Sequence, residues 1–179
     1  MGGDNMINEY LNSMNRTISD LEPNKILKVI DILRSTRDNK HWVYTFGNGG
    51  SGSTASHFAG DLSKACGFKT VCFNDSMPSL TAWANDADYR VIFERQLDKL
   101  DKKDVLFAIS GSGKSQNIIR ALKLAKEKGI YSIGLTAFDG GQLRDVANIS
   151  IIVPVYNMEQ AEDIHLMLCH IIKTALVVK

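Results

Sequence analysis

Hydrophobic residues recur at helical spacing near the start of the chain. Apolar side chains three or four positions apart form one stripe over residues 7–21 and a second over residues 26–33, and Pro23 separates the two stripes. An amphipathic helix that precedes a folded core has to bury its apolar stripe, and a second subunit offers a suitable surface. We therefore predict a pair of helices over residues 1–40 that serves oligomerisation.

From Trp42 onward the pattern changes to short apolar runs that alternate with amphipathic segments. The runs predict strands over residues 42–46, 69–73, 105–110, 131–136 and 149–153. The other segments predict helices over residues 51–64, 78–84, 89–100, 115–128, 141–146 and 158–177. This alternation is typical of a parallel sheet covered by helices on both faces. The sequence therefore predicts an α/β fold, with a five-stranded parallel sheet in one domain over residues 41–179.

The composition is that of an ordinary globular protein, with 44% hydrophobic and 23% charged residues. The 21 Lys and Arg nearly balance the 20 Asp and Glu, so no strong overall field favours a nucleic-acid or membrane partner. The start is polar and unlike a signal peptide, and no apolar run approaches the ~20 residues that span a bilayer. The 3 cysteines form no C-x-x-C pair and are expected as reduced thiols. These features predict a cytoplasmic protein.

The turn after the first predicted strand is rich in glycine, and residues 47–52 are called the glycine loop. They read Gly-Asn-Gly-Gly-Ser-Gly, the G-x-G-x-x-G pattern of dinucleotide-binding loops, and Asp75 could serve as the ribose-binding acid of such a site. The following helix, however, carries His57 and Asp61, for which a dinucleotide-binding helix has no use. Four positions apart, these side chains share one helix face and could share a metal ion. A dinucleotide site is the alternative.

A second loop follows the third predicted strand, and residues 110–115 are called the serine loop. They read Ser-Gly-Ser-Gly-Lys-Ser and end like a nucleotide-binding P-loop, but Ala108 stands where that motif has its first glycine. The loop is therefore too short to wrap a triphosphate, whereas three hydroxyls at a helix N-terminus suit a single phosphate. Ligands of parallel sheets bind beyond the carboxyl ends of the strands, where both loops lie. A serine-capped turn without a ligand is the alternative.

Six motifs in order along the chain together resemble the phosphoheptose isomerase family. They are Gly47-Asn48-Gly49-Gly50-Ser51, His57-Phe58-Ala59-Gly60-Asp61-Leu62, Ala84-Asn85-Asp86, the serine loop, Asp139-Gly140-Gly141, and Glu162-Asp163-Ile164-His165-Leu166 followed by His170. The resemblance implies a sugar isomerase (SIS) domain over residues 41–179 and a homotetramer that uses zinc. It further implies an isomerase that converts D-sedoheptulose 7-phosphate into D-glycero-D-manno-heptose 7-phosphate.

The resemblance also implies roles for individual residues. The substrate would be bound by Asn48, Gly49, Gly50, Ser51, Asp61, Asn85, Asp86, Ser110, Gly111, Ser112, Ser115 and Glu162. The metal ligands would be His57, Asp61, Glu162 and His170. Among these, Asp61 and His170 occupy the acid–base positions. By spacing alone, Asp163 would suit a site with His170 as well as Glu162 does, and the resemblance is what favours Glu162.

The chain departs from the family pattern at three positions. Asp61 stands where the family has a glutamate, Glu162 where it has a glutamine, and Gly111 where it has a threonine. The Asp61 carboxylate reaches less far, and Glu162 adds a negative charge to the site. The two changes either compensate each other or mark a subfamily that acts on another sugar phosphate.

Aldose–ketose isomerisation moves a proton between adjacent carbons through an enediol, so it needs one group that removes the carbon-bound proton and another that protonates. We assign these roles to Asp61 as base and His170 as acid. A divalent ion would polarise the substrate oxygens or act only as a structural clamp. The alternative from another class is a non-catalytic SIS adaptor, similar to replication-initiator-associating proteins, and retention of both His57 and His170 favours the enzyme.

Overall fold

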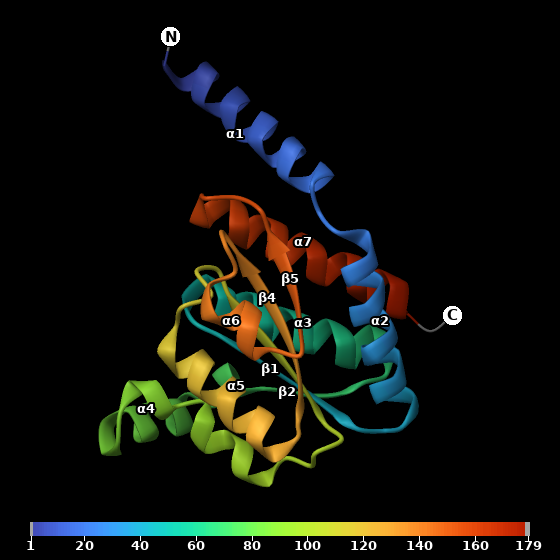
Figure 1. The fold of residues 1–179 in the computed structure, drawn as a ribbon, viewed down its shortest axis with the longest axis vertical. Coiled ribbons are helices and arrows are strands. Elements are labelled where there is room, and N and C mark those ends of the chain that lie inside the picture. The colour runs from blue at the N-terminus through green and yellow to red at the C-terminus, as the bar shows by residue number, and fades with distance from the viewer. Residues whose placement is uncertain (1, 178–179) are drawn as a thin grey trace.

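The chain folds around a five-stranded sheet, shown in Figure 1. A computed structural model describes residues 2–177. The strands are β1 (Trp42–Gly47), β2 (Lys69–Cys72), β3 (Val105–Ser110), β4 (Tyr131–Ala137) and β5 (Ile149–Val153). They lie in the order β2-β1-β3-β4-β5, and each neighbouring pair is parallel. The predicted parallel sheet is confirmed.

Helices precede, separate and follow the strands. They are α1 (Gly2–Ser19), α2 (Pro23–Asp38), α3 (Gly49–Cys66), α4 (Met77–Asp86), α5 (Gln116–Lys128), α6 (Gly141–Val146) and α7 (Met158–Leu176), with a short 3-10 helix η1 (Phe73–Asp75) after β2. The first two confirm the predicted N-terminal helical pair. Among the described residues, no helix combines the length and the apolar character that crossing a membrane requires.

The prediction of one helix over residues 89–100 is wrong. This segment forms two 3-10 helices, η2 (Tyr89–Val91) and η3 (Glu94–Lys99). The side chains of residues 91–93 are consecutive and all buried. Successive residues of an α-helix point about 100° apart, so one helix face could not bury all three. The break between the two 3-10 helices lets all three enter the core.

Helices cover both faces of the sheet. Helices α2, α3 and α7 pack on one face, and α5 and α6 pack on the other. The central strand β3 is buried along its whole length, and its side chains alternate between the two cores. Phe107 and Ile109 join the core under α3 and α7, whereas Leu106 and Ala108 join the core under α5. The sheet is therefore shielded on both faces, and its strand ends remain as the place for a ligand.

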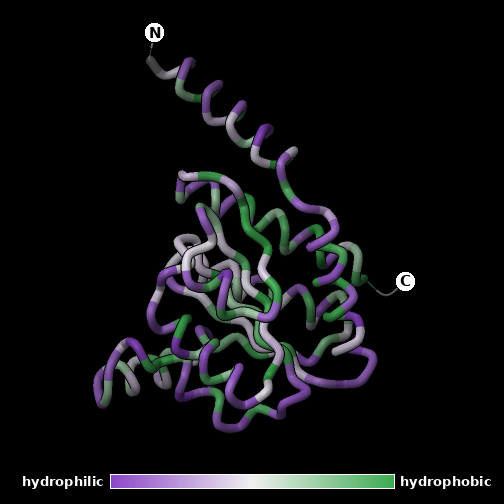
Figure 2. Tube along the Cα trace, viewed as in Figure 1, coloured by the Kyte–Doolittle hydropathy of each residue, from purple (hydrophilic) through white to green (hydrophobic). Residues whose placement is uncertain are grey.

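Helix α1 extends away from the body of the protein (Figure 1), and hydrophilic and hydrophobic positions alternate along it (Figure 2). Two polar contacts join it to α7: the Tyr10 hydroxyl donates to Asp163 Oδ2 at 2.6 Å, and the Ser13 hydroxyl donates to Gln160 Oε1 at 2.8 Å. The hydrogen bond to Asp163 raises the pKa of Tyr10 to about 12. Apart from these contacts, most of the apolar stripe of α1 is exposed.

Candidate active site

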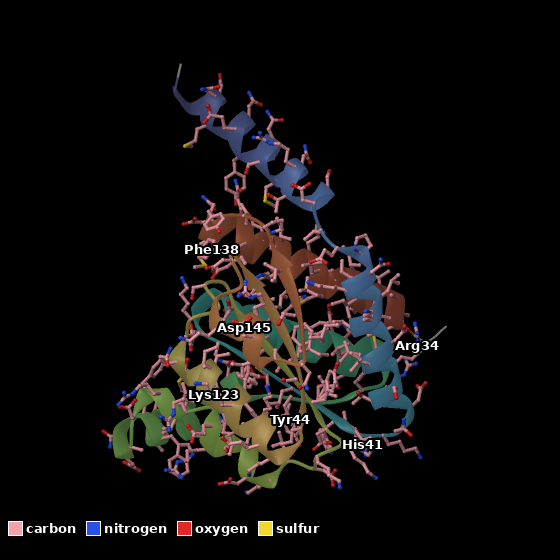
Figure 3. All side chains as sticks on the ribbon, in the orientation of Figure 1. Arg34, His41, Tyr44, Lys123, Phe138 and Asp145 are labelled. Atoms are coloured by element: carbon pink, nitrogen blue, oxygen red, sulfur yellow. The ribbon has the colours of Figure 1, made fainter. Side chains whose placement is uncertain are left out.

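The glycine loop and the serine loop lie side by side at one edge of the sheet. They follow β1 and β3, which are neighbours, and Gly47 pairs with Ile109 at the ends of these strands. Helix α3 begins within the glycine loop, at Gly49, and α5 begins directly after the serine loop, so both helix N-termini face this edge. In Figure 3, Phe138 lies at this edge of the sheet, while His41 lies at the opposite edge, before β1. The candidate site is at the Phe138 edge.

The serine loop has a shape that suits an anion. The Ser110 and Ser115 hydroxyl oxygens lie 3.3 Å apart, and Ser112 Oγ accepts a hydrogen bond from the loop backbone at 3.2 Å. Gly113 has a φ of +63° and lies against the backbone of the β4–α6 turn, so no side chain would fit there. Ser115 is the N-cap of α5, but its hydroxyl makes no cap hydrogen bond within the described part of the chain. Its oxygen accepts a hydrogen bond from Ser110, and its own proton is available to a ligand.

Gly111, the third departure from the family pattern, lies beneath Met158. A Cβ at Gly111 would lie 2.5 Å from Met158 Sδ and 3.3 Å from its Cε, so a side chain at position 111 would displace this thioether. Met158 is the first residue of α7 and is 39% exposed. The serine loop is thus bordered by the apolar thioether of Met158, whereas a threonine at position 111 would place a hydroxyl there.

His57 and Asp61 of α3 converge with His170 of α7. Nε2 of His57 lies 2.9 Å from Nε2 of His170, and Asp61 Oδ2 lies 3.4 Å from His57 Nε2 and 3.8 Å from His170 Nε2. Two ligands bonded to zinc at ~2.0 Å in tetrahedral geometry are ~3.3 Å apart, so the three donor atoms fit one such ion. Both histidines are about half exposed, which leaves the group open to solvent. The three residues could hold a divalent cation between α3 and α7.

The two candidate carboxylates of α7 face different partners. Glu162 lies against Gly50 in the first turn of α3: a Cβ at Gly50 would lie 2.6 Å from both Cδ and Oε1 of Glu162. A carboxylate at a helix N-terminus is favoured by the unpaired N–H groups and the helix dipole. Asp163 instead accepts a hydrogen bond from the Tyr10 hydroxyl. The structure therefore gathers three of the four predicted metal ligands in one group and places Glu162 beside the glycine loop.

The remaining predicted residues lie around the glycine loop or at its periphery. Gly49, Gly50 and Ser51 form the first turn of α3, and Ser51 is 5% exposed. A cavity of about 200 Å³ separates this loop from α4, and its lining includes Asn48 and Ala84. Asn85 and Asp86 end α4 on its exposed side, where Asn85 Nδ2 donates to Asp86 Oδ1 at 2.9 Å.

Sequence reasoning missed the polar side chains that brace the glycine loop. Asn74 of η1 accepts the Gly47 N–H at 3.1 Å and donates to the Gly47 carbonyl at 2.8 Å. Asn117 of α5 and Tyr89 of η2 both donate to Asn48 Oδ1, at 2.9 Å and 3.0 Å. An asparagine just after a strand end was a signal for Asn74. The other two contacts join segments that no local pattern connects.

His165 lies on α7 between Glu162 and His170 but is only 1% exposed. Its ring lies near the backbone of Thr136, yet within the described residues neither ring nitrogen has a hydrogen bond of good geometry. Burial lowers the pKa of His165 to about 4, so this imidazole is neutral at pH 7. A neutral, enclosed imidazole packs the core and exchanges no proton with a substrate.

Comparisons with known proteins identify the family of this chain. The SIS domain model matches residues 9–137. The phosphoheptose isomerase of Helicobacter pylori strain P12 is 34% identical over 149 residues, covering 80% of this chain and 78% of the relative. That of Aliarcobacter butzleri strain RM4018 is 35% identical over 151 residues, covering 81% and 80%. A phosphoheptose isomerase structure from Francisella tularensis superposes with a TM-score of 0.91 at 28% identity, covering 98% of each chain. The chain therefore belongs to the phosphoheptose isomerase family of SIS-domain proteins.

Proposed function

We propose that this protein is an aldose–ketose isomerase that converts D-sedoheptulose 7-phosphate into D-glycero-D-manno-heptose 7-phosphate. The observation that carries the proposal is the convergence of Asp61 and His170, with Oδ2 and Nε2 3.8 Å apart, between α3 and α7, the two helices whose first turns border the glycine loop and the serine loop. A carboxylate and an imidazole are the groups that enediol chemistry needs. The serine loop would hold the phosphate, and the glycine loop would hold the sugar.

The proposed reaction moves one proton between C1 and C2 of the sugar. The Asp61 carboxylate removes a proton from C1 of the ketose, and the electron pair forms an enediol as His170 protonates the C2 oxygen. Reprotonation at C2 and loss of the O1 proton then give the aldose. Asp61, on α3, and His170, on α7, are held on packed helices rather than on loops, which favours the fixed geometry that proton transfer requires. Glu162, at Gly50, would accept a hydrogen bond from a sugar hydroxyl.

A divalent cation, most consistently zinc, is proposed as the cofactor. Two imidazole nitrogens and one carboxylate oxygen within 4.8 Å of one another support this assignment. Such an ion supplies a positive charge that polarises the oxygens of the reacting carbons. His57, Asp61 and His170 would hold it, and Glu162 would have to turn away from Gly50 to join them as the fourth ligand.

We also propose a homotetramer assembled through the N-terminal helical pair, working in the cytoplasm. Met6, Ile7 and Leu11 on α1 are 66%, 55% and 54% exposed. A groove of about 610 Å³ on α7, lined by Leu166, Met167 and Ile171 among others, is a second apolar surface. If the two surfaces bury each other in the assembly, their apolar side chains are no longer exposed to water. Light scattering at micromolar concentration should give about four times the 19.8 kDa chain mass, and a monomer would contradict the assembly.

The decisive experiment incubates the untagged protein with D-sedoheptulose 7-phosphate, with and without added zinc, and analyses the product. Asp61→Asn and His170→Ala should each lower kcat by about 10²–10⁴-fold, the usual contribution of general acid–base groups. His41→Ala, at the opposite edge of the sheet, serves as the matched control and should retain activity. Wild-type protein that shows neither turnover nor bound metal would replace the isomerase by the non-catalytic adaptor.

A further inference from the structure

A pair of asparagines joins the glycine loop to the start of the helix that follows the serine loop. Asn48 Nδ2 donates to Asn117 Oδ1 at 2.9 Å, and Asn117 Nδ2 donates back to Asn48 Oδ1 at 2.9 Å, across 69 residues of sequence. Asn117 is the second residue of α5 and is 2% exposed. The two amides therefore form a closed pair, buried at Asn117 and half-buried at Asn48, between the neighbouring N-termini of α3 and α5.

Neighbouring groups fix the orientation of both amides. The Tyr89 hydroxyl donates to Asn48 Oδ1 at 3.0 Å, and the N–H of Ile118 donates to Asn117 Oδ1 at 3.0 Å. An amide oxygen accepts two hydrogen bonds, and each of these oxygens now has two. Asn48 keeps only one N–H that is not used by the protein. It can offer a sugar one donor and no acceptor.

A largely enclosed amide pair is a costly way to fill space between two helices. Apolar side chains would fill the same volume without the penalty that follows if either partner is displaced. The pair differs from apolar packing in direction: two hydrogen bonds of 2.9 Å set both the separation of the loops and their rotation. A substrate that spans the two loops needs that separation, because a displacement of about 1 Å at the reacting atoms can lower a rate about 10²-fold.

We propose that Asn117 is a positioning residue that holds the sugar-binding loop at a fixed distance from the phosphate-binding loop, with Tyr89 as the outer support of the same contact. The expected change in kcat/KM rests on the proposed function, whereas the structural role of the pair does not. Inorganic phosphate, which needs only the serine loop, should bind independently of the asparagine pair. A sugar phosphate, which needs both loops, should depend on it.

The test compares Asn117→Asp with Gln116→Glu. Aspartate keeps the shape but places a second acceptor against Asn48 Oδ1, which breaks one of the two hydrogen bonds. Gln116 is exposed and adjacent, so its replacement adds the same charge at the N-terminus of α5 and leaves the pair intact. Relative to Gln116→Glu, Asn117→Asp should lower kcat/KM for sedoheptulose 7-phosphate by about 30–100-fold. The dissociation constant of inorganic phosphate, measured by calorimetry, should agree between the two variants within about twofold.

Equal kcat/KM in both variants, or an equal loss of phosphate and sugar-phosphate binding, would overturn the proposal. Tyr89→Phe removes only the outer hydroxyl and should lower kcat/KM by about 3–10-fold, which keeps the idea testable if Asn117→Asp fails to fold. A distance measurement between spin labels at Ser53→Cys and Lys114→Cys does not depend on the substrate. Asn117→Asp should broaden that distance distribution and Gln116→Glu should not. A narrow distribution in both would overturn the positioning role even if the isomerase itself proves inactive.

Discussion

His57 and His170 face each other with their Nε2 atoms 2.9 Å apart, although 113 residues separate them in the chain. Their ring planes meet at 73°, and Asp61 approaches the same two nitrogens from the His57 side of the contact, four residues farther along α3. The site therefore depends on how α3 packs against α7. Any change that shifts one of these helices along the other separates the donor atoms.

Replacement of His57 tests the cation site. Protein purified without added metal and without an affinity tag should contain about one divalent ion per chain, measured by inductively coupled plasma mass spectrometry. His57→Ala should remove most of it, because two donors bind a divalent ion far more weakly than three. His41→Ala should leave the metal content unchanged. Equal metal content in all three proteins would place the ion elsewhere.

Gly50→Ala should displace the Glu162 carboxylate with little loss of stability. The new Cβ would overlap the end of a flexible side chain, which can turn away, whereas activity should fall at least tenfold if Glu162 is needed beside the glycine loop. Gly60→Ala is the matched control on the same helix, because a Cβ there meets nothing within 4 Å. That control should retain activity and gain about 0.5–1 kcal/mol of stability.

A double variant separates the two causes of a loss at Gly50. If displacement of Glu162 is responsible, adding Glu162→Gln to Gly50→Ala should lower kcat/KM little beyond either single change. Full additivity of the two losses would show that the backbone at Gly50, rather than Glu162, carries the effect.

Removal of hydroxyls from the serine loop should weaken phosphate binding. Ser112→Ala and Ser115→Ala should each reduce the affinity for sedoheptulose 7-phosphate and for inorganic phosphate by about 1.5–3 kcal/mol, the value of a hydrogen bond to a charged group. Calorimetry measures both affinities, with Ser63→Ala on α3 as the control. Unchanged binding in both loop variants would support the serine-capped turn.

His165 should make the fold sensitive to acid. Its pKa of about 4 in the folded protein lies below the value of 6.5 expected in the unfolded chain, so the unfolded state binds the proton first. The contribution of His165 to the free energy of unfolding is fully present above pH 6.5. It is lost as pH falls toward 4, by up to about 3 kcal/mol. Urea unfolding at pH 7 and pH 4.5 should show a smaller loss for His165→Leu than for the wild type. Parallel losses would contradict the burial of an uncharged imidazole.

Much of the fold follows from local patterns that are visible in the chain. Alternating apolar runs and amphipathic segments predicted the five parallel strands and their helices, because burial on both faces requires continuous apolar strands. The segment over residues 89–100 was the exception. Its spacing resembles that of an α-helix, but the core accepted three consecutive side chains, and this tertiary demand produced two 3-10 helices instead.

The sequence by itself determined the parts of the site that lie within one turn or loop. His57 and Asp61 share a helix face because they are four residues apart, and the serine hydroxyls gather because one short loop carries them. Only the tertiary structure decided which carboxylate of α7 faces the glycine loop and which residue holds Asn48. Periodicity defines the faces of each helix, but it leaves free the rotation and axial position of one helix relative to another. Side-chain packing between α3 and α7, and hydrogen bonds such as that of Asn48 to Asn117, determine those two quantities.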